Sequence, residues 1–101
     1  MKGIEVTNAR IASTTLGLED HGIPTCYLNL QWPGAGQGFG GYDLRHYGIE
    51  FITRTCAAVG VEKWEDLKGK PCRIRHDWGK VYAIGHIIED IWYEPERSKA
   101  K

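Results

Sequence analysis

A glycine-rich segment constrains this chain more than any other feature. Residues 31–42 read Gln-Trp-Pro-Gly-Ala-Gly-Gln-Gly-Phe-Gly-Gly-Tyr, with five of the 13 glycines inside eight residues. Glycine costs roughly 0.5–1 kcal/mol relative to alanine in regular structure, so it is retained where the backbone needs a positive φ or a close approach. One interpretation is a glycine-rich hairpin loop with a bulge. The other is a ligand loop, because free amides can hold phosphate while Phe39 and Tyr42 stack on a base.

The segment matches no known phosphate-binding motif. It lacks Gly-x-x-x-x-Gly-Lys-Ser/Thr, and residues 36–40 lack both the Gly-x-Gly-x-x-Gly spacing and a surrounding parallel βαβ unit. A nucleotide at this loop would therefore be held in some other way.

Length and composition predict one globular domain over residues 1–94, followed by a charged tail at 95–101 that frays. A chain of 101 residues has an unfavourable surface-to-volume ratio, so we expect a homo-oligomer. No apolar run approaches the ~18–20 residues of a membrane span. Cys26, Cys56 and Cys72 form no Cys-x-x-Cys pair, which indicates reduced thiols. We therefore expect a cytoplasmic protein that has no membrane partner.

The charges balance, with 13 basic and 13 acidic residues. A nonspecific DNA coat protein would normally carry a basic excess. Between residues 68 and 80, however, five basic side chains face a single acid, Asp77, so one face can still be cationic.

Hydrophobic periodicity predicts an α+β fold. Residues 3–16 and 23–32 alternate as strands and should form a first hairpin, and 39–44 should form a short third strand. Apolar residues then recur at helical spacing over 47–59, and Gly60 supplies the C-terminal cap. Residues 72–75 and 80–88 predict a second hairpin, and residues 91–93 are expected to extend its last strand. The expected architecture is an antiparallel sheet of two hairpins plus a short strand, packed against one amphipathic helix.

Several residues could bind an anionic ligand. Arg73 and Arg75 flank Ile74, so both should project from one strand face, either to grip phosphate or as a solvated strand face. Trp78 falls at a hairpin tip, where an exposed indole needs a ligand, a partner or the protein's own surface. Arg45 precedes the helix, whose N-terminus favours anions, although a plain polar junction is the alternative. The full set of candidate ligand-binding residues is Gly36, Gln37, Gly38, Phe39, Tyr42, Arg45, Arg73, Arg75 and Trp78.

No catalytic set can be assembled from the sequence. The four histidines have no metal-ligand spacing with one another or with the cysteines, so we expect no zinc site. Cys26 lies on the expected core face, which argues against a nucleophile. We therefore expect a binding protein with no cofactor and no enzymatic activity.

Four stretches resemble a known family. They are residues 9–25, the Gly36-Gln-Gly-Phe-Gly-Gly-Tyr42 signature, residues 59–67 and residues 81–88. Together they are similar to small phage and prophage proteins, of the kind called Thoeris anti-defence type 1. The resemblance implies a phage-encoded sponge that sequesters a cyclic ADP-ribose isomer or a cyclic oligonucleotide. This chain lacks an insertion that the group carries between Tyr42 and Tyr47.

Two other functions stay open. Residues 67–75 followed by a hairpin also resemble phage single-strand-binding β-barrels, which present aromatic and basic side chains to DNA. Alternatively, the protein inhibits a CRISPR complex or another host defence protein by direct protein–protein contact.

Overall fold

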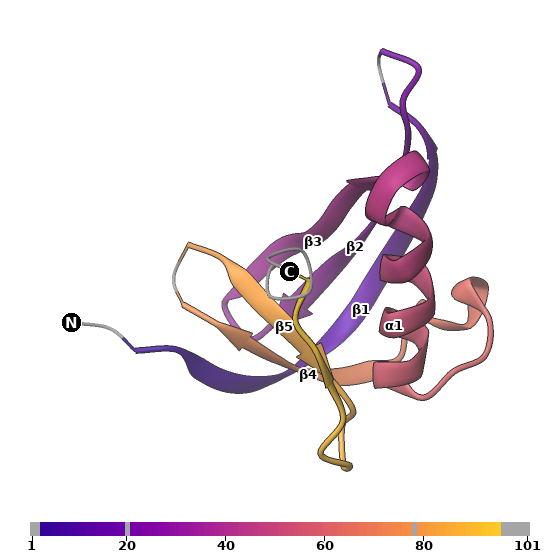
Figure 1. Ribbon diagram of the computed structural model, residues 1–101. Helices are drawn as coiled ribbons and strands as arrows, with labels where there is room; N and C mark the ends of the chain where they lie inside the picture. Colours follow the sequence, from indigo (N-terminus) through magenta and orange to yellow (C-terminus); the bar gives the residue numbers. More distant parts are fainter. Residues whose placement is uncertain (1–2, 20, 78, 96–101) are drawn as a thin grey trace.

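A computed structural model describes residues 3–19, 21–77 and 79–95. It confirms the α+β class, with one six-stranded antiparallel sheet and one helical segment (Figure 1). The elements in chain order are β1 (Glu5–Leu18), β2 (Pro24–Trp32), β3 (Ala35–Asp43), a π-helical turn (Leu44–Gly48), α1 (Ile49–Val59), a 3₁₀ turn (Trp64–Asp66), β4 (Pro71–His76), β5 (Val81–Gly85) and β6 (Trp92–Tyr93).

The strand order is β3-β2-β1-β4-β5-β6, with the long strand β1 near the middle. The C-terminal part of β1 pairs with β2 and its N-terminal part pairs with β4, and a bulge interrupts β1 between Ile11 and Ser13. Buried and exposed residues alternate along β2 and β4, because one face of the sheet packs on the core and the other faces outward.

The arrangement of two hairpins plus one short strand is not confirmed. The glycine-rich segment is strand β3, which begins at Ala35, whereas we predicted a loop there and a strand from residue 39. The predicted bulge is present, because the register with β2 shifts at Gly41. Residues 91–93 do not extend the preceding strand; Trp92 and Tyr93 instead form β6, which pairs antiparallel with β5.

The helical segment packs on the inner face of the sheet (Figure 1). It begins at Leu44, earlier than the predicted residue 47, because the Asp43 carboxylate accepts a hydrogen bond from the Arg45 amide at 2.9 Å. It ends at the predicted cap, where Gly60 has φ +96°. Phe51 is fully buried and its ring contacts Phe39, Trp64 and Tyr93, with centroids 5.6 to 6.3 Å apart.

The sheet curls so that β3 approaches β5 across the inner face, and we call the boundary between these two strands the seam. Trp32 at the end of β2 packs on His76 at the end of β4, with ring centroids 4.9 Å apart. No hydrogen-bonded ladder joins β3 to β5 in the described part of the chain, so this seam is held by side chains. Pro95, which we had assigned to the frayed tail, is buried beside the seam, and residues 96–101 lie outside the described residues.

Candidate functional site

The outer face of β1, β2 and β3 is polar. On β2 the side chains of Cys26, Leu28 and Leu30 are buried against the core, so the alternate side chains project outward. The register places each outward residue of β2 beside one residue of β1 and one of β3. We call this set the polar face, without Gly40, whose Cβ position is directed at the Phe51 ring in the core; it consists of Arg10, Ser13, Thr15, Tyr27, Asn29, Gln31, Gly36 and Gly38.

Hydrogen bonds between strands order the side chains of the polar face. The Asn29 amide Nδ2 donates to the Ser13 hydroxyl at 2.8 Å. One step along, Arg10 Nη2 donates to the Gln31 carbonyl Oε1 at 3.3 Å. These bonds use only part of the hydrogen-bonding capacity of the two side-chain amides, so Asn29 and Gln31 can still donate to a ligand and accept from it.

Two neighbouring hollows mark this face. One has a volume of about 440 Å³ and lies over Ser13, Asn29, Gly36 and Gly38. The next has about 400 Å³ and extends over the following outward residues of the same strands to the β1–β2 loop. Both volumes fall within the roughly 300–1,000 Å³ of small-molecule sites. A nucleotide-sized ligand therefore has room on the polar face.

The glycines of β3 explain the first hollow. Gly36 and Gly38 pair with Gln31 and Asn29, so any side chain at either position would project from the polar face. At Gly38 a Cβ atom would meet only the Leu28 carbonyl oxygen, at 4.0 Å. The space above this strand exists because side chains are absent, and not because the backbone is strained.

Tyr27 is the aromatic residue of the polar face. Its cross-strand partners are Thr15 on β1 and Gly40 on β3, and it lines the 400 Å³ hollow with His21 of the β1–β2 loop. The glycine partner leaves one flank of Tyr27 without a neighbouring side chain, as a base stacked on the ring would require.

The outer face continues onto β4, where it carries two arginines. Arg73 and Arg75 both project outward, as predicted, and both lie against Trp92 of β6, with guanidinium carbons 5.1 and 4.0 Å from the ring centroid. Trp92 can lie close to the sheet because its partner is Gly85, where a Cβ atom would come within 2.7 Å of the indole. Its Nε1 donates to the Asp90 carboxylate at 2.9 Å.

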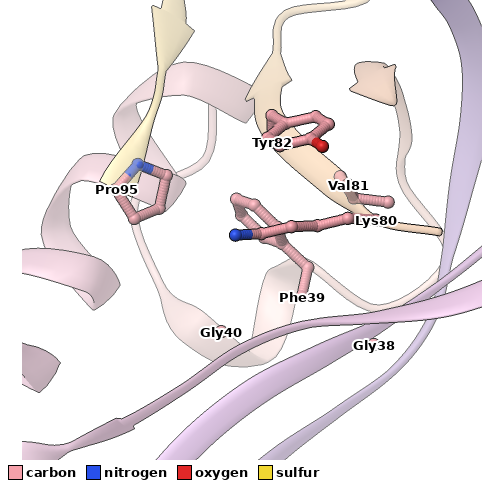
Figure 2. A pocket seen from close by; sticks show the side chains of 7 residues that line it. All are labelled: Gly38, Phe39, Gly40, Lys80, Val81, Tyr82 and Pro95. Carbon is pink, nitrogen blue, oxygen red and sulfur yellow. The ribbon is translucent and has the colours of Figure 1, made fainter. Parts of the chain in front are cut away.

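The other side of the glycine strand borders the seam. Lys80 and Tyr82 of the β4–β5 hairpin line a cavity of about 110 Å³ together with Phe39, Gly40 and Pro95 (Figure 2). A neighbouring cavity of about 60 Å³ lies between the β2–β3 and β4–β5 hairpins. Both are too small for a nucleotide.

The structure separates the predicted ligand-binding residues into groups. Gly36, Gln37 and Gly38 line the 440 Å³ hollow, whereas the buried Phe39 packs toward Phe51. Arg73 and Arg75 lie on another part of the outer face. The backbone of Tyr42 pairs with Cys26 and nothing is described of its side chain; Trp78 lies outside the described residues.

Arg45 is paired within the protein. Its guanidinium Nη2 lies 2.8 Å from Asp43 Oδ2, and Nε donates to the same carboxylate. The Arg45 side-chain hydrogen bond, followed by that of its backbone N–H, lowers the pKa of Asp43 to about 2. The charge of Arg45 therefore serves the start of the helical segment rather than an open anion site.

Sequence reasoning missed the residues that shape the polar face on β1 and β2, together with Trp92. The signal was present, because Tyr27, Asn29 and Gln31 alternate with the core residues of a predicted strand. The exposed half of that alternation gives no sign of a site until the β1 and β3 neighbours are known.

Burial and hydrogen bonding account for the pKa shifts of the buried cysteines and of Asp77. Burial raises the pKa of Cys72 to about 12 and that of Cys26 to about 11. The Tyr82 hydroxyl donates to Asp77 at 2.6 Å and lowers the pKa of that carboxyl. Among the described residues, no group of three or more histidine, cysteine or acidic side chains could hold a metal ion.

No protein-family model, curated protein or solved structure matched this chain. Within the described residues, no helix has the length and hydropathy to cross a membrane.

Proposed function

We propose that this protein binds nucleotides on its polar face without catalysing a reaction. The observation that carries the proposal is a pair of neighbouring hollows on this face: glycines and side-chain amides line one of about 440 Å³, and Tyr27 lines the other, of about 400 Å³. Asn29 and Gln31 offer hydrogen bonds to base edges, Tyr27 offers a ring for stacking, and Arg10 offers positive charge for phosphate.

Strand order supports the same proposal. The order β3-β2-β1-β4-β5, with a helix between the third and fourth strands, is that of the five-stranded barrels of the OB-fold. In that fold the face of strands 2 and 3 and the adjoining loops bind oligonucleotides and oligosaccharides. Fold alone does not decide function, so the strand order supports the proposal by analogy and the proposal rests on the two hollows.

Sequestration of a cyclic nucleotide by a phage anti-defence protein of the bacterial cytoplasm is a second proposal. It rests on the resemblance of the Gly36–Tyr42 signature, and the volume of either hollow would accommodate one nucleotide unit. The two cavities at the seam are too small for a nucleotide, so tight sequestration would need a second subunit to cover the polar face. Inhibition by direct contact with a host defence protein predicts no nucleotide binding at all.

The test is a titration of the purified protein with a labelled oligothymidylate and with a labelled cyclic dinucleotide, read by fluorescence anisotropy. Tyr27→Ala should weaken binding by about 1–3 kcal/mol, which is the contribution of one base stacked on an aromatic ring. Tyr47→Ala is the matched control, because Tyr47 is an exposed tyrosine in the helical segment. Equal affinity in Tyr27→Ala and Tyr47→Ala would contradict the proposal, as would the absence of binding to either ligand.

A further inference from the structure

We infer that the ligand is an extended single strand of nucleic acid, which continues from the polar face onto β4 along three arginines. The inference rests on the proposed function and deepens it by naming the class of ligand. Arg10, Arg73 and Arg75 form what we call the arginine row, and Trp92 lies beside Arg73 and Arg75.

The register places the arginine row on one surface. Arg10 lies at the edge of the polar face, beside Gln31 on β2 and Pro71 on β4. Arg73 is the next outward residue of β4 after Pro71, and Arg75 follows it. Alternate residues of a strand are about 6.4–6.8 Å apart, which is on the order of the distance between neighbouring phosphates in an extended single strand.

No described carboxylate pairs with the arginines of the row. No ion pair joins Arg10, Arg73 or Arg75 to a described acidic side chain, in contrast to the Arg45–Asp43 pair. Arg73 is instead held by backbone carbonyl oxygens: its Nε donates to His86 and its Nη2 to Glu89, each at 2.7 Å. These bonds fix the guanidinium but leave its positive charge unneutralised.

Arg75 is the most informative member of the row. Its guanidinium carbon lies 4.0 Å from the Trp92 ring centroid, and no described residue accepts a hydrogen bond from it. A stacked guanidinium is already oriented, so it loses little side-chain entropy when it binds a phosphate bidentately. Its neighbour on β1 is Val6, which is exposed and carries no competing charge.

The length of the surface favours a polymer over a cyclic dinucleotide. From Val6, beside Arg75, to Thr15, beside Tyr27, β1 runs nine residues, or about 30 Å at 3.3 Å per residue. A compact cyclic ligand in one hollow cannot reach Arg75. A single strand can cover the whole surface, as strands of roughly 4–16 nucleotides do on OB barrels.

The experiment measures affinity against ligand length and salt. Oligothymidylates of about 2 to about 16 nucleotides, parallel oligouridylates and a cyclic dinucleotide are titrated by anisotropy at several salt concentrations. Wild-type affinity should rise with length until the arginine row is occupied. Arg75→Gln should leave the dinucleotide affinity unchanged, weaken the long strand by about tenfold and reduce the slope of log K against log salt by about 0.7.

Two further variants separate the charge of Arg75 from its stacked geometry and provide a control. Arg75→Lys keeps the charge and should retain most of the salt slope while losing the stacked geometry. Arg54→Gln removes an exposed arginine of α1, on the other side of the sheet, and should change neither quantity. Comparison of the thymidylate and uridylate series then shows whether DNA or RNA is preferred.

Failure of the inference and failure of the proposed function would give different results. If short oligonucleotides bind through Tyr27 but neither length nor Arg75→Gln matters, the inference is overturned and the proposed function stands. The same holds if a cyclic dinucleotide binds more tightly than every linear strand. If no nucleotide binds, the proposed function fails and the inference fails with it.

Discussion

The two sides of strand β3 differ in packing, although one glycine-rich segment forms both. Toward the seam, Gly40 lets the Phe51 ring approach so closely that a Cβ atom would come within 2.5 Å of it. Toward the outer face, Gly38 leaves open space that a side chain could occupy. Glycines from the same short motif therefore have different reasons to be glycine: one permits core packing and the other keeps a surface hollow.

The largest expected effect is on the packed side. Gly40→Ala should destabilise the fold by roughly 2–4 kcal/mol, since the residue has φ +111° and the new methyl group would overlap Phe51. Denaturant unfolding measures this loss. Gly38→Ala is the matched control in the same strand, and its free energy of unfolding should change by no more than about 1 kcal/mol. Equal stability of the two variants would contradict the distinction between the two sides.

The closed inner face should also protect the thiols. Cys26 projects from β2 into the core, and burial raises its pKa from 9.0 to about 11. At neutral pH this leaves about a hundredfold less thiolate than an ordinary cysteine has, so a thiol reagent should react very slowly with the native protein. Labelling followed by mass spectrometry, with a denatured sample as the control, gives the rates. Rapid labelling of Cys26 in the folded protein would show that the inner face is open.

On the outer side, filling the hollow should affect binding and not stability. Gly38→Val adds a side chain above the floor of the 440 Å³ hollow, so oligonucleotide affinity should fall by about tenfold, or 1.4 kcal/mol. Valine suits a strand, so the melting temperature should not fall. Gly3→Val, at an exposed position with nothing within 4 Å of the added Cβ, is the control. Unchanged affinity in a folded Gly38→Val protein would remove this hollow from the site.

The smallest effect concerns the seam and its dependence on pH. The Tyr82 hydroxyl is the main cause of the lowered pKa of Asp77, so the ionised carboxylate is favoured in the folded state. A lowered folded pKa contributes stability above the ordinary value of 3.8, and that stability is lost as the pH falls through the folded pKa. Tyr82→Phe should therefore lower the melting temperature slightly at neutral pH.

At pH values below the folded pKa of Asp77 the wild type and Tyr82→Phe should melt at nearly the same temperature. Thermal scans from neutral to acidic pH test this convergence. A difference that stays constant over the whole range would mean that Tyr82 acts by packing in the seam and not through its bond to Asp77.

Periodicity predicted the features that depend on residues close together in the sequence. The alternation of Cys26, Leu28 and Leu30 with polar residues specified both a strand and its buried face. Apolar spacing and Gly60 specified most of the helix and its end, and the placement of Arg73 and Arg75 on one face followed from their spacing. The start of the helical segment was missed because the side chain of Asp43 caps it two residues before Arg45.

The sequence by itself determined the fold class, the composition of each strand face and the buried cysteines, since these depend on local periodicity and hydrophobicity. Tertiary structure alone decided that the glycine segment is a strand, because glycine has little strand preference and β2 supplies the hydrogen-bonding partner. It also decided that Arg75 stacks on Trp92, 17 positions along the chain, whereas the pairing of Arg45 with Asp43, two residues away, is local. Which hollow exists, and which charge remains free, depends on contacts between strands that no local pattern encodes.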